Sequence, residues 1–427
     1  MKVINYPEKE IWKELLKRPS YNVTTLFGTV EKVLQKVRQD GDKAIYELEK
    51  EFDGVDLKAL TVSDQEWNEA NENVDSSLKE ALKLAFENIA CFHKAQSFKP
   101  IVVETQPGVT CTQRAIPIEK VGLYIPGGTA PLFSTVLMLA TPAKIAGCRE
   151  IILCTPPNKE GKVHPAILCA ARIAGVDKVF KIGGSQAIAA MAYGTESVPK
   201  VDKIYGPGNQ YVTAAKQLVS LEDVAIDMPA GPSEVEVLAD ETSNPVFVAA
   251  DLLSQAEHGT DSQVLLVSTS ETLIANVQQE IERQLALLPR RELARKSLDN
   301  SKLILMKNID EAIELTNAYA PEHLILSIKN YRTIAEQITH AGSVFMGPYS
   351  CESAGDYASG TNHTLPTKGY AKAYSGLCLD SFVRKITFQE LTEEGIRRIG
   401  PAVEKMAAGE QLEAHKNAMT VRLESLK

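Results

Sequence analysis

The chain has 427 residues, which is enough for a large hydrophobic core and two or three domains. Hydrophobic residues make up 44% of it and charged residues 24%, so the composition is that of a globular protein and excludes a disordered or fibrous one. The formal net charge of −9 argues against nucleic acid or an anionic membrane as a partner, and it would tolerate a cationic ligand.

The cysteines and the apolar stretches indicate a protein of a reducing compartment. The seven cysteines show neither zinc-finger spacing nor a disulfide framework, so we expect free thiols. The N-terminal stretch MKVINYPEKEIWKELLKRP is charged throughout and lacks the apolar segment of a secretion signal. The most apolar stretch, TVLMLATPAKIAG, is interrupted by Pro142 and Lys144 and is too short to cross a bilayer. We therefore expect a cytoplasmic protein.

The first part of the chain has helical periodicity. Apolar residues recur every three or four positions from residue 1 to about 98, with a break at Asp40-Gly41. Residues 101–118 have a β-strand pattern, divided into two runs by Pro107-Gly108. This part therefore predicts helices followed by two strands.

From residue 121 onward, short apolar runs alternate with helical stretches. A first series reaches about residue 219, and a second runs from the stretch PVFVAADLLSQAEHG to GSVFMG. Strict alternation predicts parallel sheets covered by helices on both faces, so we expect two similar α/β units in tandem. About 29 irregular residues follow, and long irregular segments of this kind are often functional. The final stretch returns to a helical pattern and carries Glu410 and His415.

The stretch LLSQAEHGTD contains the first candidate site. Gln255 and His258 are three positions apart, which places both on one face of a helix, with Asp251 a turn earlier. The three side chains could bind a metal ion. They could equally form a hydrated helix end, with Gly259 as the C-cap.

The remaining histidines differ in context. His93, His164 and His340 lie within or at the ends of predicted helices, and we interpret them as structural or solvent-facing. Glu322 and His323, in the stretch APEHLIL, combine a carboxylate with an imidazole, which suits general acid–base chemistry. The alternative is that adjacent strand residues point to opposite faces, so that one of the two is merely exposed.

Two further candidates lie in the irregular segment. Asp356 and His363 are surrounded by glycine, which lets a backbone approach a ligand, although a plain turn would use the same residues. If Gln255, His258, Asp356 and His415 converged, two nitrogens and two oxygens would suit zinc or a similar divalent ion. The dinucleotide signal is weak, because the third glycine of the fingerprint would fall on Tyr211.

Taken together, several motifs resemble the histidinol dehydrogenase family from end to end. They are VGLYIPGG, GGSQAIAAMAYGTESVPKVDKIYGPGN, DMPAGPSE, LLSQAEHG, APEHL, GDYASGTNHTLPT and EAHKNAMTVRL. Their order and spacing are far more specific than any one of them alone.

This resemblance implies a zinc- and NAD-dependent enzyme that oxidises L-histidinol through L-histidinaldehyde to L-histidine, the last steps of histidine biosynthesis. It implies the following roles: Gln255, His258, Asp356 and His415 as metal ligands; Glu322 and His323 as the acid–base pair; Ser233, His363 and Glu410 as further substrate contacts beside His323 and the metal ligands; Tyr124, Gln186 and Asn209 as NAD contacts.

The resemblance also implies a fold of two Rossmann-like parallel-sheet domains with small helical extensions at both ends. We expect an N-terminal helical extension in residues 1–20, a first domain in 21–123 plus 232–377 and a second in 124–231. A C-terminal helical segment in 378–427 would reach the partner subunit of a homodimer with shared active sites.

Three alternatives remain open at this point. Cys148 or Cys154 could be an aldehyde-oxidising nucleophile, although both lie at the edge of an apolar run where buried thiols are common. The protein could instead be a zinc-dependent hydrolase that uses Glu322 as its base without a nucleotide. The third alternative is a non-catalytic nucleotide-binding regulator.

Overall fold

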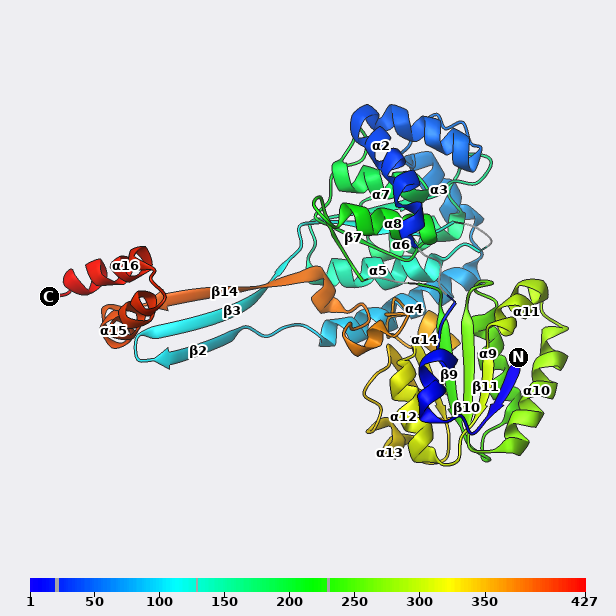
Figure 1. Ribbon diagram of the computed structural model, residues 1–427. Helices are drawn as coiled ribbons and strands as arrows, with labels where there is room; N and C mark the ends of the chain where they lie inside the picture. The colour runs from blue at the N-terminus through cyan, green and yellow to red at the C-terminus, as the bar shows by residue number, and fades with distance from the viewer. Residues whose placement is uncertain (20–22, 128–129, 229–230) are drawn as a thin grey trace.

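The computed structural model describes residues 1–19, 23–127, 130–228 and 231–427. It has three parts: two α/β domains, each built on a parallel sheet, and an arm that projects away from both of them (Figure 1).

The first α/β unit, here the five-stranded domain, has the strand order β6-β5-β4-β7-β8 with every pair parallel. Its buried side chains form two hydrophobic clusters, which also include residues of three preceding helices. The strands are β4 (Lys120–Tyr124), β5 (Glu150–Thr155), β6 (Lys178–Lys181), β7 (Lys203–Tyr205) and β8 (Ala225–Ile226). The helices are α2 (Phe27–Leu48), α3 (Asp64–Asn73), α4 (Ser76–Ala95), α5 (Phe133–Ala146), α6 (Pro165–Ala174), α7 (Gly184–Tyr193) and α8 (Gln210–Val219), with short turns Val23–Leu26 and Glu49–Asp53.

The second unit, here the six-stranded domain, has the order β1-β11-β10-β9-β12-β13, again parallel throughout. The strands are β1 (Lys2–Asn5), β9 (Glu234–Ala239), β10 (Gln263–Ser268), β11 (Lys302–Leu305), β12 (His323–Ser327) and β13 (Ser343–Met346). The helices are α1 (Trp12–Leu15), α9 (Pro245–Ala256), α10 (Glu271–Leu285), α11 (Arg291–Asp299), α12 (Ile309–Tyr319), α13 (Tyr331–Ala335) and α14 (Glu352–Tyr357), with short turns Lys9–Ile11, Tyr370–Lys372 and Leu379–Phe382.

The two units share one topology. The order β11-β10-β9-β12-β13 repeats β6-β5-β4-β7-β8 strand for strand, and β1 is an addition at one edge. The predicted fold class, two parallel-sheet α/β units in tandem, is confirmed.

The grouping of the N-terminal part differs from the prediction. Residues 2–5, expected to be helical, form a strand that pairs with β11. Helices α2 to α4 pack on the five-stranded domain, whereas we had grouped residues 21–123 with residues 232–377. An amphipathic pattern shows that a helix has a buried face, but not which sheet covers that face. The predicted boundary between residues 20 and 21 lies outside the described residues, and the domain boundaries stay a prediction.

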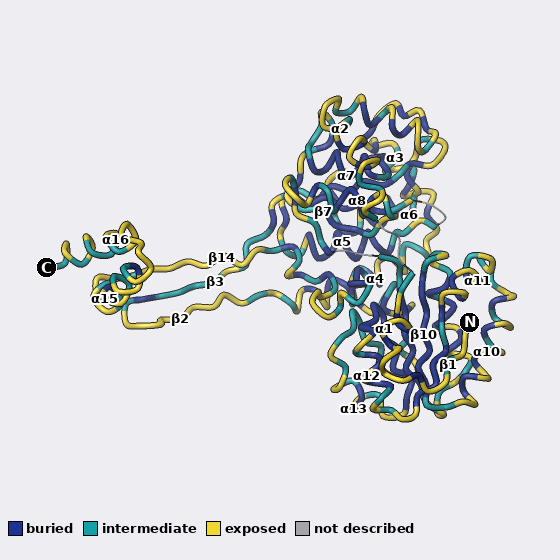
Figure 2. Tube along the Cα trace, viewed as in Figure 1, coloured by how far each residue is buried: buried dark blue, intermediate teal, exposed yellow. Residues whose placement is uncertain are grey.

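The arm consists of an antiparallel sheet in the order β14-β3-β2 and a terminal pair of helices. Two of its strands confirm the expected run at 101–118, whereas β14 occupies a segment that we expected to be helical. Most of β2 and β14 is exposed on both faces, so burial imposes no alternation on their sequences (Figure 2). The elements are β2 (Ile101–Gln106), β3 (Val109–Pro117), β14 (Val383–Leu391), α15 (Glu393–Gly409) and α16 (Glu413–Glu424).

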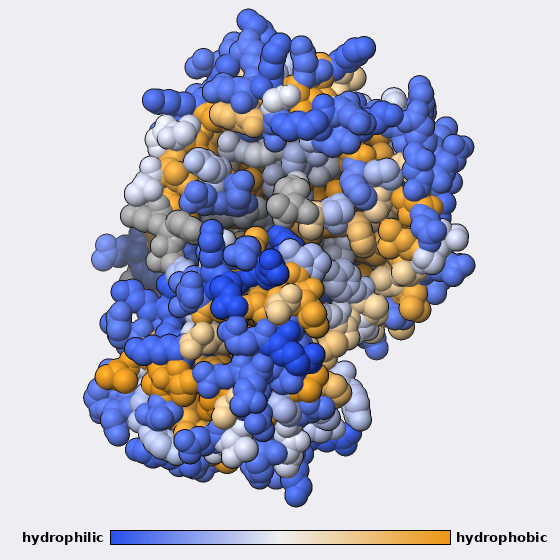
Figure 3. All heavy atoms as spheres, turned by 90° about the vertical axis from the view of Figure 1, so that its right-hand side faces the viewer, coloured by the Kyte–Doolittle hydropathy of each residue, from blue (hydrophilic) through white to orange (hydrophobic). Residues whose placement is uncertain are grey.

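Two other expectations can be compared with the structure. Gly41 interrupts α2 with a φ of 53°, and an added Cβ there would lie 2.3 Å from Oε2 of Glu196, so the predicted break is confirmed. No described helix is long and apolar enough to cross a membrane. On the face drawn in Figure 3, hydrophobic residues form separate patches among hydrophilic ones.

Candidate active site

A cavity of about 160 Å³ lies between the two α/β domains. The five-stranded domain contributes the carboxyl edge of its sheet, where Gly206 and Asp227 follow β7 and β8. The six-stranded domain contributes the amino edge of its sheet, where β12 begins. Seven of the predicted site residues line this cavity: Ser233, Gln255, His258, Glu322, His323, Asp356 and His363.

The predicted acid–base pair lies at the start of β12. Glu322 and His323 are both buried, so the alternative that one of them is merely exposed is wrong. A carboxylate oxygen of Glu322 accepts a hydrogen bond from the backbone N–H of Glu234 at 2.8 Å, and Nδ1 of His323 lies 3.1 Å from the carbonyl oxygen of Glu234. Nδ1–H therefore donates to that carbonyl, and Nε2 is left as the basic nitrogen.

The predicted Gln255–His258 pair does not lie on one continuous helix. Helix α9 ends at Ala256 with Glu257 as its C-cap, so His258 lies beyond the helix and Gly259 is not the cap. The chain still turns, because the N–H of His258 donates to the carbonyl of Gln255 at 3.2 Å. Gln255 is buried while His258 is exposed, and both line the cavity.

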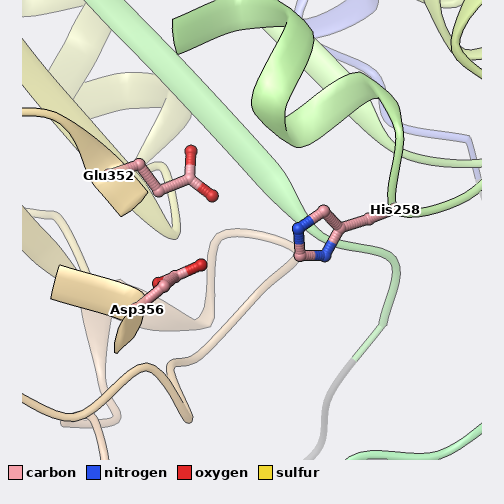
Figure 4. A group of neighbouring side chains, drawn as sticks. All are labelled: His258, Glu352 and Asp356. Atoms are coloured by element: carbon pink, nitrogen blue, oxygen red, sulfur yellow. The ribbon is translucent and has the colours of Figure 1, made fainter. Parts of the chain in front are cut away.

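Asp356 lies on the short helix α14, within the segment that we expected to be irregular. One helical turn before it, Glu352 points in the same direction, and both carboxylates face His258 (Figure 4). Potential ligand atoms of His258, Glu352 and Asp356 lie within 4.8 Å of one another. With its amide nitrogen toward Glu352, Gln255 donates to that carboxylate at 2.5 Å. Glu352 was not predicted, although its i,i+4 spacing from Asp356 is the signal that could have identified it.

The electrostatics of this cluster suit a divalent cation. Glu322, Glu352 and Asp356 bring three carboxyl groups together, and no Lys or Arg is found among the described residues that line the cavity. Oδ1 of Asp356 and Oε2 of Glu352 are buried without a hydrogen-bond partner. A mixed set of nitrogen and oxygen donors of this kind is one that zinc accepts.

Burial and the neighbouring carboxylates alter the pKa values of the acid–base pair. Burial raises the pKa of Glu322 to about 8. Burial acts to lower the pKa of His323, but the carboxylates of Glu352, Glu322 and Asp356 together raise that pKa well above its ordinary value. Both shifts favour the proton-bound form of the group, and a cation bound beside the same carboxylates would lower both pKa values.

His363 and Ser233 complete the part of the site that one chain supplies. Nδ1 of His363 lies 3.0 Å from the carbonyl oxygen of Asp356, and its Nε2 lies 3.1 Å from the hydroxyl of Thr135 on α5. His363 thus connects α14 to the five-stranded domain across the cavity. Ser233 immediately precedes β9 and is half-buried.

The structure does not bring Glu410 and His415 to this cavity. Both are exposed and lie at the distal end of the arm, which projects away from the two domains (Figures 1 and 2). Within one chain, the predicted metal site therefore has three of its four ligands.

A second cavity, of about 830 Å³, contains the three predicted NAD contacts, Tyr124, Gln186 and Asn209. Tyr124 ends β4 and Asn209 follows β7, so the cavity lies where the strand order reverses, at the carboxyl edge of the five-stranded sheet. Ligands of open α/β sheets bind at this position. The N-termini of α7 and α8 also lie there.

A buried glutamate that we did not predict supports this second cavity. Oε1 of Glu49 accepts from the backbone N–H of Gly183 at 2.9 Å and from the amide of Gln186 at 2.8 Å. Burial raises the pKa of Glu49 to about 7. The hydroxyl of Tyr124 accepts from the N–H of Gly184 at 3.0 Å, which fixes the turn before α7.

The two cavities are adjacent along two stretches of chain. Pro131 and Asn209 line the larger cavity, whereas Leu132 and Pro207 line the smaller one. Gly206 has a φ of 121°, and an added Cβ would lie 2.1 Å from the carbonyl oxygen of Tyr124. Only glycine allows this close approach, which holds the β7–α8 loop between the cavities.

The cysteines examined as possible nucleophiles are buried in hydrophobic clusters. Cys148 and Cys154 line neither cavity among the described residues, and burial raises the pKa of Cys148 to about 12. A thiol in this state is a poor nucleophile, so the packing interpretation stands.

The other histidines are structural. His93 is buried, with Nδ1 2.8 Å from the carbonyl of Ile89, and His164 caps α6. Nδ1 of His340 lies 3.2 Å from the carbonyl oxygen of Asn317.

The fold and the paired cavities define the class: a two-domain α/β enzyme with a polar, carboxylate-rich site between its domains. The chain belongs to the histidinol dehydrogenase family, which it matches over residues 16–423, and it is accordingly an oxidoreductase. It is 69% identical over 427 residues to a histidinol dehydrogenase of Bacteroides thetaiotaomicron, covering 100% of both chains. It is 52% identical over 418 residues to that of Escherichia coli K12, covering 97% of this chain and 95% of the relative.

A solved structure is similar over the whole chain. The crystal structure of histidinol dehydrogenase from Elizabethkingia anophelis matches with a TM-score of 0.98 and 52% identity, covering 100% of this chain and 98% of the other. Family membership favours the dehydrogenase over the hydrolase and the non-catalytic regulator.

Proposed function

We propose that this protein oxidises L-histidinol to L-histidine in two steps, each with NAD as hydride acceptor, at a site that contains zinc. The observation that supports this most directly is the placement of the acid–base pair and the candidate metal ligands in one inter-domain cavity, next to a second cavity with the candidate NAD contacts. Two adjacent cavities suit a reaction that transfers hydride from a small substrate to a dinucleotide.

Gln255, His258 and Asp356 would hold the divalent ion, with Glu352 beside them. The ion would supply positive charge that binds and orients the substrate, and NAD would accept the hydride lost in each oxidation. Ser233 and His363 would contact the substrate directly. Tyr124, Gln186 and Asn209 would contact NAD.

The residues of this chain would move the protons. In the first oxidation, Nε2 of His323 takes the proton of the substrate hydroxyl as the carbon loses hydride, which gives the aldehyde. In the second, the carboxylate of Glu322 takes a proton from the water that adds to the aldehyde carbon. The resulting hydrate then loses hydride from the same carbon and becomes the carboxylic acid. Both steps need the aldehyde to stay in the cavity.

We further propose that a homodimer completes each site, with Glu410 and His415 supplied by the arm of the partner. In a single chain, the arm exposes apolar side chains on both its sheet and its helices, including Val102, Phe388 and Met406. Exposed apolar side chains on a projecting arm are typical of a surface that another chain covers. His258 is exposed in the single chain, so it is accessible to a ligand from elsewhere.

The test is to add histidinol and NAD to the purified protein and to follow the absorbance of NADH with and without a chelator. We expect two NADH per histidinol and loss of activity after the metal is removed. One NADH per histidinol would refute the four-electron reaction, and full activity of metal-free protein would refute the metal site. Elemental analysis identifies the ion, because this donor set also accepts manganese or cobalt.

A further inference from the structure

A buried ion pair behind the acid–base residues links the N-terminal segment to the candidate active site. Arg18, just after α1, forms a two-pronged contact with Glu234, with Nε to Oε1 at 2.6 Å and Nη2 to Oε2 at 2.9 Å. The side chain of Glu234 is 3% exposed and that of Arg18 is 15% exposed. A two-pronged contact of this kind fixes orientation as well as distance.

Arg18 also holds the backbone that precedes the acid–base pair. Its Nη2 donates to the carbonyl of Tyr319 at 2.7 Å and to that of Ala320 at 3.3 Å, and its guanidinium lies 3.9 Å from the centre of the Tyr319 ring. Ala320 ends α12 with a φ of 54°, a left-handed conformation that is uncommon for alanine. Arg18 therefore stabilises the turn from which Glu322 and His323 follow two and three residues later.

The other end of the ion pair positions the same two side chains. The backbone of Glu234 contacts both of them, with its N–H donating to Glu322 and its carbonyl accepting from Nδ1 of His323. The carboxylate of Glu234 is held from a third direction by the backbone N–H of Lys368 at 2.7 Å. One guanidinium thus connects the strand that orients the acid–base pair to the turn that carries it.

We propose that Arg18 and Glu234 are positioning residues for catalysis: their ion pair sets the separation of Glu322 and His323 and keeps the proton of His323 on Nδ1. This inference rests on the proposed acid–base roles of those two residues. Neither Arg18 nor the carboxylate of Glu234 lines the cavity, so the pair acts through Glu322 and His323.

The experiment compares substitutions in the intact, metal-loaded enzyme. Arg18→Met should lower kcat for histidinol oxidation by about 100-fold, which is the effect of misplacing catalytic groups by about an ångström. The KM for NAD should change little, because the larger cavity lies on the other domain. Arg18→Lys should recover only part of the loss, because an ammonium group cannot make the two-pronged contact. Glu234→Gln should lower kcat in the same way, and it provides a second variant if Arg18→Met does not fold.

The matched control is Glu66→Gln. Glu66 forms a partly buried ion pair with Lys181, with side chains 15% and 8% exposed, and neither residue lines a cavity. This control should keep the kcat of the wild type. A folded Arg18→Met or Glu234→Gln protein with kcat within about twofold of the control would overturn the positioning role.

A double variant separates positioning from general stability. If Arg18 acts through Glu322, Arg18→Met should add little loss of aldehyde oxidation once Glu322→Gln is present, whereas additive losses would contradict the proposal.

The singly substituted Glu322→Gln and His323→Ala proteins test the proposed function itself. If both kept full activity, the acid–base roles and the positioning role would fail together. If they lost activity while Arg18→Met kept it, only the positioning role would fail.

Discussion

Pairing two differently damaged chains tests whether each active site is assembled from two subunits. One chain carries Glu322→Gln in the six-stranded domain, and the other carries His415→Ala in the arm. Within one chain the arm projects away from the inter-domain cavity, so Glu322 and His415 act together only across a dimer (Figure 1).

Symmetry gives the size of the effect. In a heterodimer, one site combines an intact Glu322 with an intact His415, and the other site combines both substitutions. One of the two sites is then functional, so a purified heterodimer should show about half of wild-type kcat per dimer. Random assembly makes half of all dimers mixed, and the unfractionated sample should show about a quarter.

The assay is the rate of L-histidine formation from histidinol by co-expressed chains that carry different affinity tags, because this product requires both oxidations. Two-step purification isolates the heterodimer, and each homodimer prepared in the same way is the inactive control. If the arm instead folds back onto its own chain, neither site of the heterodimer is intact. A heterodimer as inactive as both homodimers would therefore refute the shared site.

Three further predictions concern single residues. Glu322→Gln should slow aldehyde oxidation by about 100-fold and alcohol oxidation far less, because only the second step uses Glu322 as the base toward water. Each oxidation is measured with its own substrate, and equal losses would contradict this role. Serine in place of Cys148 or Cys154 should leave both oxidations intact, and selective loss of the second would restore the covalent route. Glu236 is buried on β9, and burial raises its pKa from 4.5 to about 7, so the folded chain favours its protonated form. The free energy of unfolding should therefore be highest below pH 4.5 and should fall by about 3 kcal/mol in total as the pH rises through 7. Denaturant titrations at several pH values should show this fall for the wild type and not for Glu236→Gln. Parallel pH curves for the wild type and Glu236→Gln would refute the assignment.

The sequence predicted the parallel sheets well, because their strands are short apolar runs bounded by turns. The alternation of these runs with helices is visible without any knowledge of pairing. Four strands escaped prediction: β8 and β9 lie between the two expected series, and β1 and β14 have partners far along the chain. β1 pairs with β11, and β14 pairs with β3 in an arm that buries little. Neither has a local pattern that reveals its partner.

The candidate site was likewise predicted in part. Gln255, His258, Glu322 and Asp356 were identifiable because they lie in short motifs, and the fold brings them to one cavity. The supporting residues were not identifiable. Glu49 and the Arg18–Glu234 pair are defined by contacts across long stretches of chain. Nothing in their immediate neighbours distinguishes them from surface charges.

The common topology of the two domains suggests why the cavities use opposite edges of their sheets. In a parallel α/β unit, helices begin at the carboxyl edge and end at the amino edge. The larger cavity, at a carboxyl edge, therefore receives the N-termini of α7 and α8, whose N–H groups and positive dipole ends favour the phosphates of a dinucleotide.

The smaller cavity uses the amino edge of the six-stranded sheet, where α9 ends two residues before His258. The carbonyls and negative dipole end of a helix C-terminus favour a cation, and the nearby carboxylates add to that preference. Under the proposed function, stacking a carboxyl edge against an amino edge would place an anion-binding region next to a cation-binding region, with the reacting carbon of the substrate between them. Two domains of the same topology are sufficient for this arrangement, because the five-stranded domain contributes the carboxyl edge of its sheet and the six-stranded domain the amino edge.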